Sequence, residues 1–339
     1  MNLCKLVTSF KPVERFTRVT NRFRQAAEAV LSPLEQRQAM VLPADQAAIA
    51  EIASKVSKGE CILFLGAGVH YPPPEGSIYS YPEEQRLPLG RAFSQALADK
   101  SGFSEQFPKD STGNLQRVAL YYETKLGRNS LVNEIKNAVM YGKKASPVVR
   151  ALARLNFPLV ITTNYDQLFE DALRMPKPLG PEKRPFVSVY NKDGNEPTKE
   201  YPGDPAADQP FVVKIHGDVQ SPESMVITDE DYIQFVLRMS DKIPYNPIPL
   251  TFSYFFTRRP TLFVGYSLMD YNLRLLFKTL RWKIDPSNIP DTYSVDLYPD
   301  PLILDVWYNQ RRYVRFIAQD VWTFVPNLYR MITGEEMPQ

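Results

Sequence analysis

Two polar side chains stand where apolar runs end, and both are of types that could do chemistry. His216 follows the run from Val212 to Ile215, and Asn164 follows a run that ends in two threonines. An imidazole can accept a proton near neutral pH, and a carboxamide can both donate and accept hydrogen bonds. Buried strands of this kind end at the sheet edge where α/β proteins bind ligands. The spacing predicts a reactive centre built from these two side chains.

Less specific explanations exist for the same residues. His216 could be a core histidine whose ring bonds a neighbouring carbonyl, although Gly217 after it would leave the ring accessible at the exit of the strand. Asn164 could belong to an Asx-turn, and Asp166 could be only the N-cap of the next helix. The other histidine, His70, precedes prolines and is expected on the loop surface or at the rim of the site.

A glycine turn follows another apolar run. Gly66, Ala67 and Gly68 supply part of the dinucleotide fingerprint G-x-G-x-x-G, but Tyr71 occupies the place of its third glycine. Glycines after a strand let backbone N–H groups approach a pyrophosphate, although an ordinary tight turn has the same composition.

A second turn and an acidic residue extend this pattern. The turn from Gly265 to Ser267 follows the run Thr261–Val264 and could close over a phosphate or a ribose. Asp296, within a predicted strand Tyr293–Leu297, could bind ribose hydroxyls, as acidic residues do in dinucleotide-binding folds. The pattern indicates a dinucleotide pocket with Asn164 and His216 at its reactive end.

Short apolar runs alternate with helical spacing along most of the chain. Strands are predicted over 61–65, 159–163, 186–190, 211–215, 261–264, 293–297 and 313–318. Helices are predicted from an N-cap at Asp45 to Gly59, within 88–140, and over 147–155, 166–173, 270–282, 302–311 and 320–334. This alternation predicts an α/β fold, a Rossmann-like doubly wound parallel sheet with an inserted small helical module.

The predicted organisation has two parts. Residues 1–42 form an N-terminal helical extension, and residues 43–334 form the nucleotide-binding domain, with the helical insertion at about 88–143 and a loop-rich segment at about 176–210.

Composition narrows the class of protein. The 339 residues carry 40 basic and 38 acidic side chains, and this near-balance gives no support to nucleic-acid binding. Cys4 and Cys61 can form neither a disulfide framework nor a four-cysteine zinc site, and Cys61 is expected to be a small buried hydrophobe. No apolar stretch is long enough to span a membrane and no signal peptide is evident, so a cytoplasmic protein is expected.

Four motifs in a fixed order identify a resemblance. The series G-A-G, T-T-N-Y-D, K-I-H-G-D and V-G-Y-S resembles the sirtuin-like (Sir2-type) family of bacterial NAD-consuming proteins over about residues 46–332. The resemblance implies that NAD lies between a Rossmann-type sheet and a smaller module. It also implies that Asn164 holds the ribose or the attacking water, that Asp166 shapes the pocket and that His216 is the base. The cofactor-binding residues that it implies are Gly66, Ala67, Gly68, Asp166, Gly265 and Ser267. Thr163, at the end of its strand, and Asp296 complete the predicted cofactor-binding set.

Two departures from the family pattern favour hydrolysis of NAD. Protein deacylases of this family carry a zinc ribbon with four cysteines, and this chain has two cysteines in all. Their acidic-Phe-Arg stretch is replaced here by the segment from Arg86 to Gly90. The resemblance therefore implies a metal-free NAD hydrolase of the antiphage-defence type, acting as a homo-oligomer or beside a HerA-like partner ATPase or a phage-derived trigger. The alternatives are an NAD-dependent deacylase or ADP-ribosyltransferase, and a non-catalytic nucleotide-binding or assembly subunit.

Overall fold

The structure is a computed structural model that describes residues 43–176, 182–190, 192, 198–240, 248–266, 268, 288–302, 304 and 314–339. The predicted N-terminal extension, Ser267, the helix predicted at 270–282 and most of the helix predicted at 302–311 lie outside the described residues. The division of the chain at residue 42 stays a prediction.

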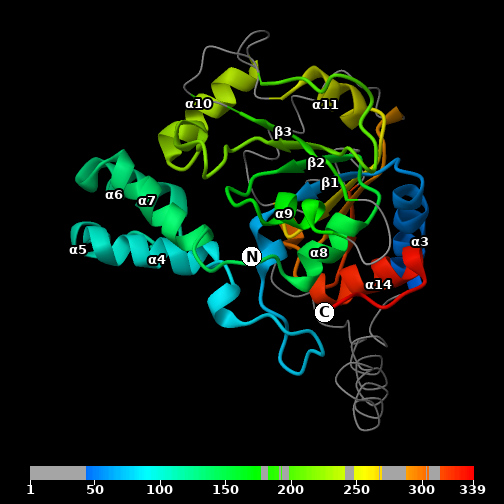
Figure 1. Cartoon of the computed structure of the whole chain (residues 1–339). Helices are drawn as coiled ribbons and strands as arrows, with labels where there is room; N and C mark the ends of the chain where they lie inside the picture. Colours follow the sequence, from blue (N-terminus) through cyan, green and yellow to red (C-terminus); the bar gives the residue numbers. More distant parts are fainter. Residues whose placement is uncertain are drawn as a thin grey trace, which may run out of the picture.

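A parallel sheet of seven strands forms the centre of the molecule (Figure 1). Its spatial order is β3-β4-β2-β1-β5-β6-β7. The strands are β1 (Ile62–Leu65), β2 (Leu159–Thr162), β3 (Phe186–Val189), β4 (Phe211–Lys214), β5 (Thr261–Val264), β6 (Thr292–Val295) and β7 (Val314–Ile317). The central strands are buried on both faces, as continuous apolar runs predict. The doubly wound parallel sheet expected from the sequence is confirmed.

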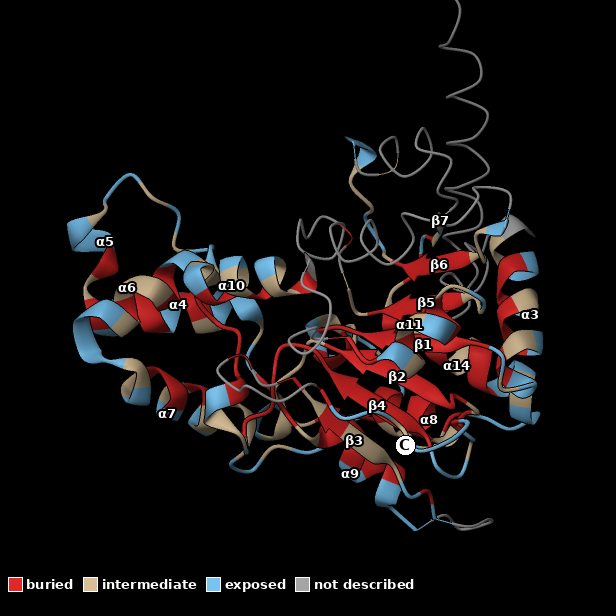
Figure 2. Ribbon diagram, turned by 90° about the horizontal axis from the view of Figure 1, so that it is seen from above, coloured by how far each residue is buried: buried red, intermediate tan, exposed pale blue. Residues whose placement is uncertain are grey.

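Helices cover both faces of the sheet (Figure 2). One face packs against α3 (Pro43–Ser57), α8 (Pro147–Arg154), α9 (Leu168–Arg174) and α14 (Val321–Thr333). The opposite face packs against α10 (Asp229–Ser240) and α11 (Leu250–Phe256). Alternate residues of β1 belong to the two cores, with Leu63 and Leu65 on one side and Ile62 and Phe64 on the other.

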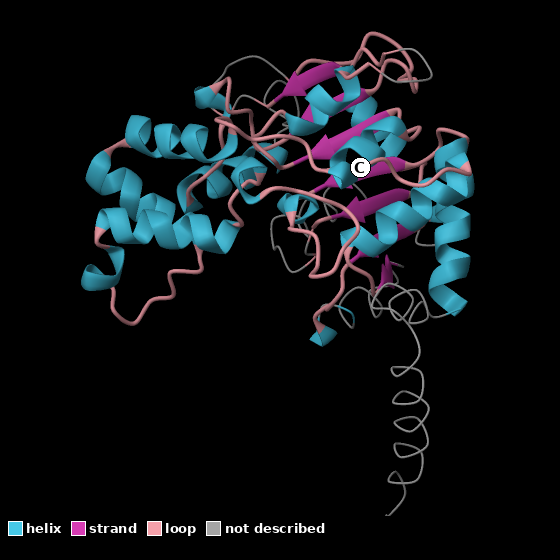
Figure 3. Cartoon of the chain, turned by 60° about the horizontal axis from the view of Figure 1, so that its bottom comes forward, coloured by secondary structure: helices cyan, strands magenta, loops and turns pink. Residues whose placement is uncertain are grey.

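A small helical module projects from the strand-bearing body, as Figure 3 shows. It consists of α4 (Gly90–Ser101), α5 (Phe103–Gln106), α6 (Leu115–Leu126) and α7 (Arg128–Val139), in the region where the sequence predicts helices. These helices share an apolar core that also takes in Met225 and Ile227 from the segment after β4. Arg128 joins the module to α10 through an ion pair with Asp231 at 2.7 Å. The module is therefore held against the carboxyl side of β4.

Several helix boundaries differ from the prediction. Asp45 is not an N-cap, because α3 begins at Pro43, where a proline suits the first turn. Asp166 does not begin α9, which starts at Leu168, but its Oδ1 accepts the Leu168 N–H at 3.0 Å. Asp320 is the N-cap of α14, as predicted, and its side chain accepts hydrogen bonds from the N–H groups of Trp322 and Thr323.

Two further findings concern buried and apolar segments. Cys61 precedes β1 and is buried among apolar side chains, as expected. Across the described ranges no helix is both long and apolar enough to cross a bilayer.

Candidate active site

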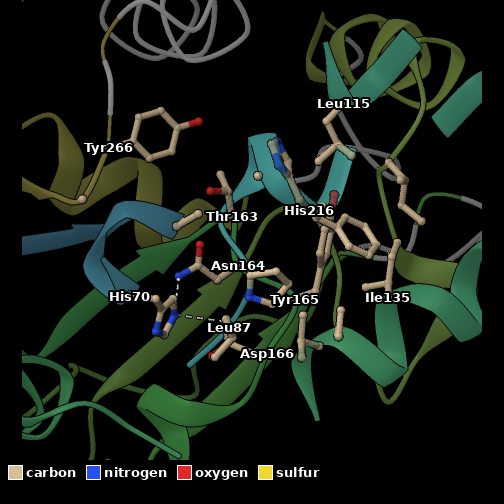
Figure 4. A pocket seen from close by; sticks show the side chains of 18 of the residues that line it. His70, Leu87, Leu115, Ile135, Thr163, Asn164, Tyr165, Asp166, His216 and Tyr266 are labelled. Carbon is tan, nitrogen blue, oxygen red and sulfur yellow. Dashed lines mark hydrogen bonds and ion pairs between the residues drawn. The ribbon is translucent and has the colours of Figure 1, made fainter. Parts of the chain in front are cut away.

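A cavity of about 340 Å³ opens where the carboxyl ends of the central strands meet the helical module (Figure 4). β1 is the strand at which the sheet order reverses, because the chain continues to β2 on one side and later returns to β5 on the other. Crevices at such reversal points are the usual ligand sites of open α/β sheets. The lining residues from the strand ends are Ala67, His70, Thr163, Asn164, Tyr165, Asp166, His216, Gly265 and Tyr266. The volume lies within the range of small-molecule sites.

Asn164 enters the cavity from the turn after β2. Its backbone N–H donates to the Thr162 hydroxyl at 3.0 Å, which holds the turn against the strand end. Its Nδ2 donates to the Gly66 carbonyl at 3.3 Å. Because that partner is an acceptor only, the amide is oriented with its nitrogen toward Gly66, and Figure 4 shows its oxygen on the side away from His70. Oδ1 is thus placed to accept a hydrogen bond from a ligand.

His216 lines the same cavity two residues after β4. The side chain is 4% exposed, and its ring lies edge-on to the rings of Tyr232 and Phe235, with centroids 5.0 and 5.3 Å away. Its Nδ1 is 3.4 Å from the Tyr232 hydroxyl. In its neutral form an imidazole carries a lone pair that can accept a proton, so the side chain is of a type suited to a general base.

Gly217 has a steric role that the sequence does not reveal. Its φ is +87°, and a Cβ there would lie 2.3 Å from the Ser224 carbonyl oxygen. The glycine is needed because the chain folds back on itself immediately after His216. The imidazole reaches the cavity by its own orientation, with Ile227 and Tyr232 beside it in the cavity wall.

His70 is buried in the site and not on the loop surface, which corrects the sequence-based expectation. It is 4% exposed and ends the 3₁₀ turn η1 (Ala67–His70) that continues directly from the glycine turn. Its Nε2 lies 3.3 Å from Asp166 Oδ2 and 3.4 Å from Asn164 Nδ2. In a 3₁₀ turn, side chains three residues apart lie on one side, so Ala67 and His70 both line the cavity.

Asp166 is held ionised beneath the cavity. Burial alone would raise the pKa of its carboxyl, but His70 and Lys214 outweigh burial and lower that pKa to about 2. Asp166 Oδ1 accepts the Leu168 N–H and Oδ2 faces His70, so both oxygens have partners. The residue that the sequence presented as a possible helix cap is therefore also part of the cavity wall.

Lys214 ties the two turns that carry Asn164 and His216 to one another. The side chain is fully buried, and its Nζ lies 2.9 Å from Glu170 Oε1 and 2.7 Å from Asp218 Oδ2. It also donates to the Asp166 carbonyl at 2.5 Å. Burial alone would lower the pKa of Lys214, but the surrounding carboxylates outweigh it and raise that pKa. A single buried cation thus joins the turn after β2, the turn after β4 and helix α9.

The glycine turns after β1 and β5 interlock. The Gly68 N–H donates to the Gly265 carbonyl at 2.7 Å, and the Gly66 N–H donates to Val264 at 3.0 Å. A Cβ on Gly66 would lie 2.4 Å from the Gly265 oxygen, and one on Gly265, whose φ is +70°, would lie 2.1 Å from the Val69 nitrogen. These glycines are required by the close approach of two backbone turns, and two of their N–H groups are occupied within the protein.

Only some of the other predicted cofactor-binding residues line the cavity. Thr163, Ala67 and Gly265 line the cavity, whereas Gly66 and Gly68 lie behind it in the interlocked turns. Asp296 follows β6 instead of lying within it, is not part of the cavity wall, and accepts the Tyr298 N–H at 3.0 Å.

The wall opposite the strand ends is apolar and comes mainly from the helical module and the segment before it. Leu87, Pro88, Gly90, Phe93, Leu115, Ile135, Ala138 and Val139 contribute to it. Arg86 does not line it, because its Nε donates to the Tyr81 carbonyl at 2.6 Å. The segment that replaces the acidic-Phe-Arg stretch therefore presents apolar atoms to the cavity.

Comparison with known proteins identifies relatives at low identity. Residues 158–316 match the family model described as SIR2-like domain. "Defense-associated sirtuin 2" of Bacillus subtilis is 22% identical over 257 residues, covering 75% of this chain and 22% of that protein. "NAD(+) hydrolase ThsA" of Enterococcus faecium is 26% identical over 245 residues, covering 71% of this chain and 44% of that protein. The proteins of the same name from Acinetobacter baumannii and Bacillus cereus are each 28% identical, over 173 and 191 residues.

The matched region includes part of the candidate site. The chain spans less than half the length of these curated relatives. Asn164, His216 and Gly265 all fall inside residues 158–316. Residues 158–316 are therefore similar to SIR2-like domains, in line with the resemblance that the order of the strand-end motifs indicates.

Proposed function

We propose that the chain hydrolyses NAD⁺ at the bond between nicotinamide and ribose, releasing nicotinamide and ADP-ribose. The observation that carries the proposal is the cavity at the reversal point of the sheet, into which the Asn164 amide and the His216 imidazole both project. The SIR2-like domain and relatives named NAD(+) hydrolase support the same reaction.

Cleavage of the bond between nicotinamide and ribose needs little acid catalysis from the protein. The nicotinamide nitrogen is already cationic, so it leaves as a neutral ring when it takes the electron pair of the C–N bond. Positive charge develops on the ribose in an oxocarbenium-like transition state, and water then forms the new C–O bond. Asn164 Oδ1 is placed to orient the water or a ribose hydroxyl, because Nδ2 is bound to Gly66. His216 would accept the proton that the water loses.

The tautomer of His216 follows from its contact with Tyr232. If Nδ1–H donates to the Tyr232 hydroxyl, Nε2 carries the lone pair that accepts the proton. Asp166, ionised at the cavity wall, contributes negative charge where positive charge develops. The apolar module wall would exclude bulk water and strengthen this interaction.

The relatives' names extend the proposal to a biological role. We propose that the protein depletes NAD as an antiphage defence effector in the cytoplasm, with NAD as substrate and no resident metal. We further propose that the protein forms a homo-oligomer and acts together with a partner ATPase or a phage-derived trigger. Light scattering of the full chain tests the oligomer, and co-purification with candidate partners tests the association.

The deciding experiment follows nicotinamide and ADP-ribose while purified protein is incubated with NAD⁺. We expect stoichiometric release of both products, and a loss of at least ~100-fold in turnover for His216→Ala and for Asn164→Ala. Thermal unfolding of each variant controls for folding. A parallel incubation with an acetylated peptide tests the alternative, because a deacylase or ADP-ribosyltransferase would consume NAD⁺ only when an acceptor is present. Near-wild-type turnover by a folded variant would remove that residue from the mechanism.

A further inference from the structure

His70 is a buried ionisable side chain at the site to which the proposed reaction gives no role. It lies in the cavity wall between Asn164 and Asp166, and Figure 4 shows both contacts. Its Nδ1 is buried and has no hydrogen-bond partner within the described ranges. A buried ring nitrogen without a hydrogen-bond partner lowers the stability of the fold, so its presence here calls for an explanation by the contacts of the other ring nitrogen.

We propose that His70 is a positioning residue of the NAD-cleaving site. It donates Nε2–H to Asp166 Oδ2, which fixes the carboxylate in its ionised form, and its ring limits the space beside the Asn164 amide. This inference deepens the proposed function and rests on it. His70 touches neither the reacting bond nor the water, and acts through the two side chains that it holds.

The tautomer of His70 follows from its two neighbours. Asp166 Oδ2 is an ionised oxygen and accepts only, so the ring nitrogen 3.3 Å away carries the proton. The Asn164 Nδ2, 3.4 Å from the same nitrogen, cannot donate to a nitrogen that already bears a proton, so its hydrogen bond goes to Gly66. The Asn164 amide therefore keeps its oxygen directed away from His70, as Figure 4 shows.

Loss of the ring would disturb both neighbours. Without His70 the Asp166 carboxylate loses a donor in a fully buried place, where burial favours the protonated form. The space vacated next to Asn164 would let its amide rotate, and misplacement of a group by about 1 Å can cost about 100-fold in rate. The reaction would then slow without a matching loss of substrate affinity, because the apolar module wall and the glycine turns are unchanged.

The test compares His70→Ala with His70→Gln in the nicotinamide-release assay. Glutamine can place an N–H donor near the position of Nε2, so we expect His70→Gln to stay within about fivefold of wild type. We expect kcat of His70→Ala to fall about 10- to 100-fold with KM changed less than about threefold. Added imidazole should restore part of the kcat of His70→Ala, because the vacated space adjoins the cavity.

A matched control separates positioning from general destabilisation. Ser94 is fully buried in α4, and its hydroxyl donates to the Thr112 carbonyl away from the cavity. Ser94→Ala should lower the melting temperature without lowering kcat, and imidazole should have no effect on it. Wild-type kcat in His70→Ala would overturn the proposal. A fall in kcat that parallels the fall in melting temperature, and that neither His70→Gln nor added imidazole reverses, would also overturn it.

A second readout does not depend on turnover. The chain has two histidines, so the ¹⁵N ring spectrum of histidine-labelled protein contains two ring systems, which His70→Gln assigns. We expect a slowly exchanging Nε2 proton on His70 that shifts in Asp166→Asn. A His70 ring protonated only at Nδ1 would contradict the proposal. If wild-type protein releases no nicotinamide, the proposed function fails, and this spectrum still decides the geometry of His70.

Discussion

The two histidines are equally buried but sit in opposite environments. His70 lies against an ionised carboxylate, whereas His216 lies against the rings of Tyr232 and Phe235. A carboxylate accepts a hydrogen bond from one ring nitrogen and so orients an imidazole, whereas aromatic rings contact its edges and leave a ring nitrogen able to face the cavity. The comparison agrees with the proposed roles, in which the His70 side of the cavity orients groups and the His216 side transfers a proton.

The two sides also differ in how they are held. Below His70, Asp166 belongs to a buried group of charges that includes Lys214, Glu170 and Asp218. Around His216 the packing is aromatic and involves α10. Charges hold the first side, and ring contacts hold the second, so substitutions of the two kinds should have different signatures in stability and in activity.

The largest effect on stability is expected from the charged side. Lys214→Met would leave Glu170 and Asp218 buried without their cation, and we expect the free energy of unfolding to fall by about 3–5 kcal/mol. The control is Lys100→Met, which removes an exposed ion pair with Glu134 and should cost less than about 1 kcal/mol. Urea unfolding measures both. Equal effects would show that burial of the Lys214 cluster carries no special weight.

A smaller, pH-dependent effect is expected from Asp166→Asn. The pKa of Asp166 is about 2 in the fold against an ordinary value of 3.8, so the ionised carboxylate stabilises the fold by about 2 kcal/mol above pH 4. This contribution is lost as the pH falls from about 4 to about 2. The difference in unfolding free energy between wild type and variant should therefore shrink across that window. A difference that is constant from pH 6 to pH 3 would contradict it.

The smallest effect is expected on the aromatic side. Tyr232→Phe keeps the ring against His216 and removes the hydroxyl near its Nδ1, so we expect kcat to fall about fivefold and the free energy of unfolding to change by less than about 1 kcal/mol. Tyr254→Phe, an exposed change on α11, is the matched control and should alter neither quantity. A fall in stability without a fall in kcat would place the hydroxyl in folding and not in catalysis.

The strands were predictable because burial leaves a direct mark on sequence. Thr261–Val264 is a run bounded by a proline and a glycine, and β5 has those bounds. Helix starts were less accurate: α3 begins two residues before Asp45, and Asp166 accepts the Leu168 N–H although α9 begins only at Leu168. The meeting of Asn164 and His216 at one cavity followed from the rule that parallel strands end at a shared edge.

The burial of His70 escaped prediction, because the prolines after it suggested a place on the loop surface or at the rim of the site. The 3₁₀ turn that carries it inward depends on Gly265, which is about two hundred residues away in the chain and receives the Gly68 N–H. A local pattern holds no information on such a contact. The spacing of three residues between Ala67 and His70, in a turn that follows a strand, was the available signal. The steric need for glycine at position 217 was hidden for the same reason, because Ser224 approaches it from outside the motif.

The interlocked glycines have a consequence for how the protein can be altered. Where the turns after β1 and β5 meet, main-chain atoms leave no room for any side chain, so a mutational library at Gly66, Gly68 or Gly265 should yield only inactive or misfolded variants. If the proposed function holds, selectivity among dinucleotides can instead be altered from the opposite wall, where the side chains of Leu87, Phe93 and Ile135 line the cavity. One wall of the site is thus main chain that tolerates no substitution, and the opposite wall consists of side chains that can be exchanged.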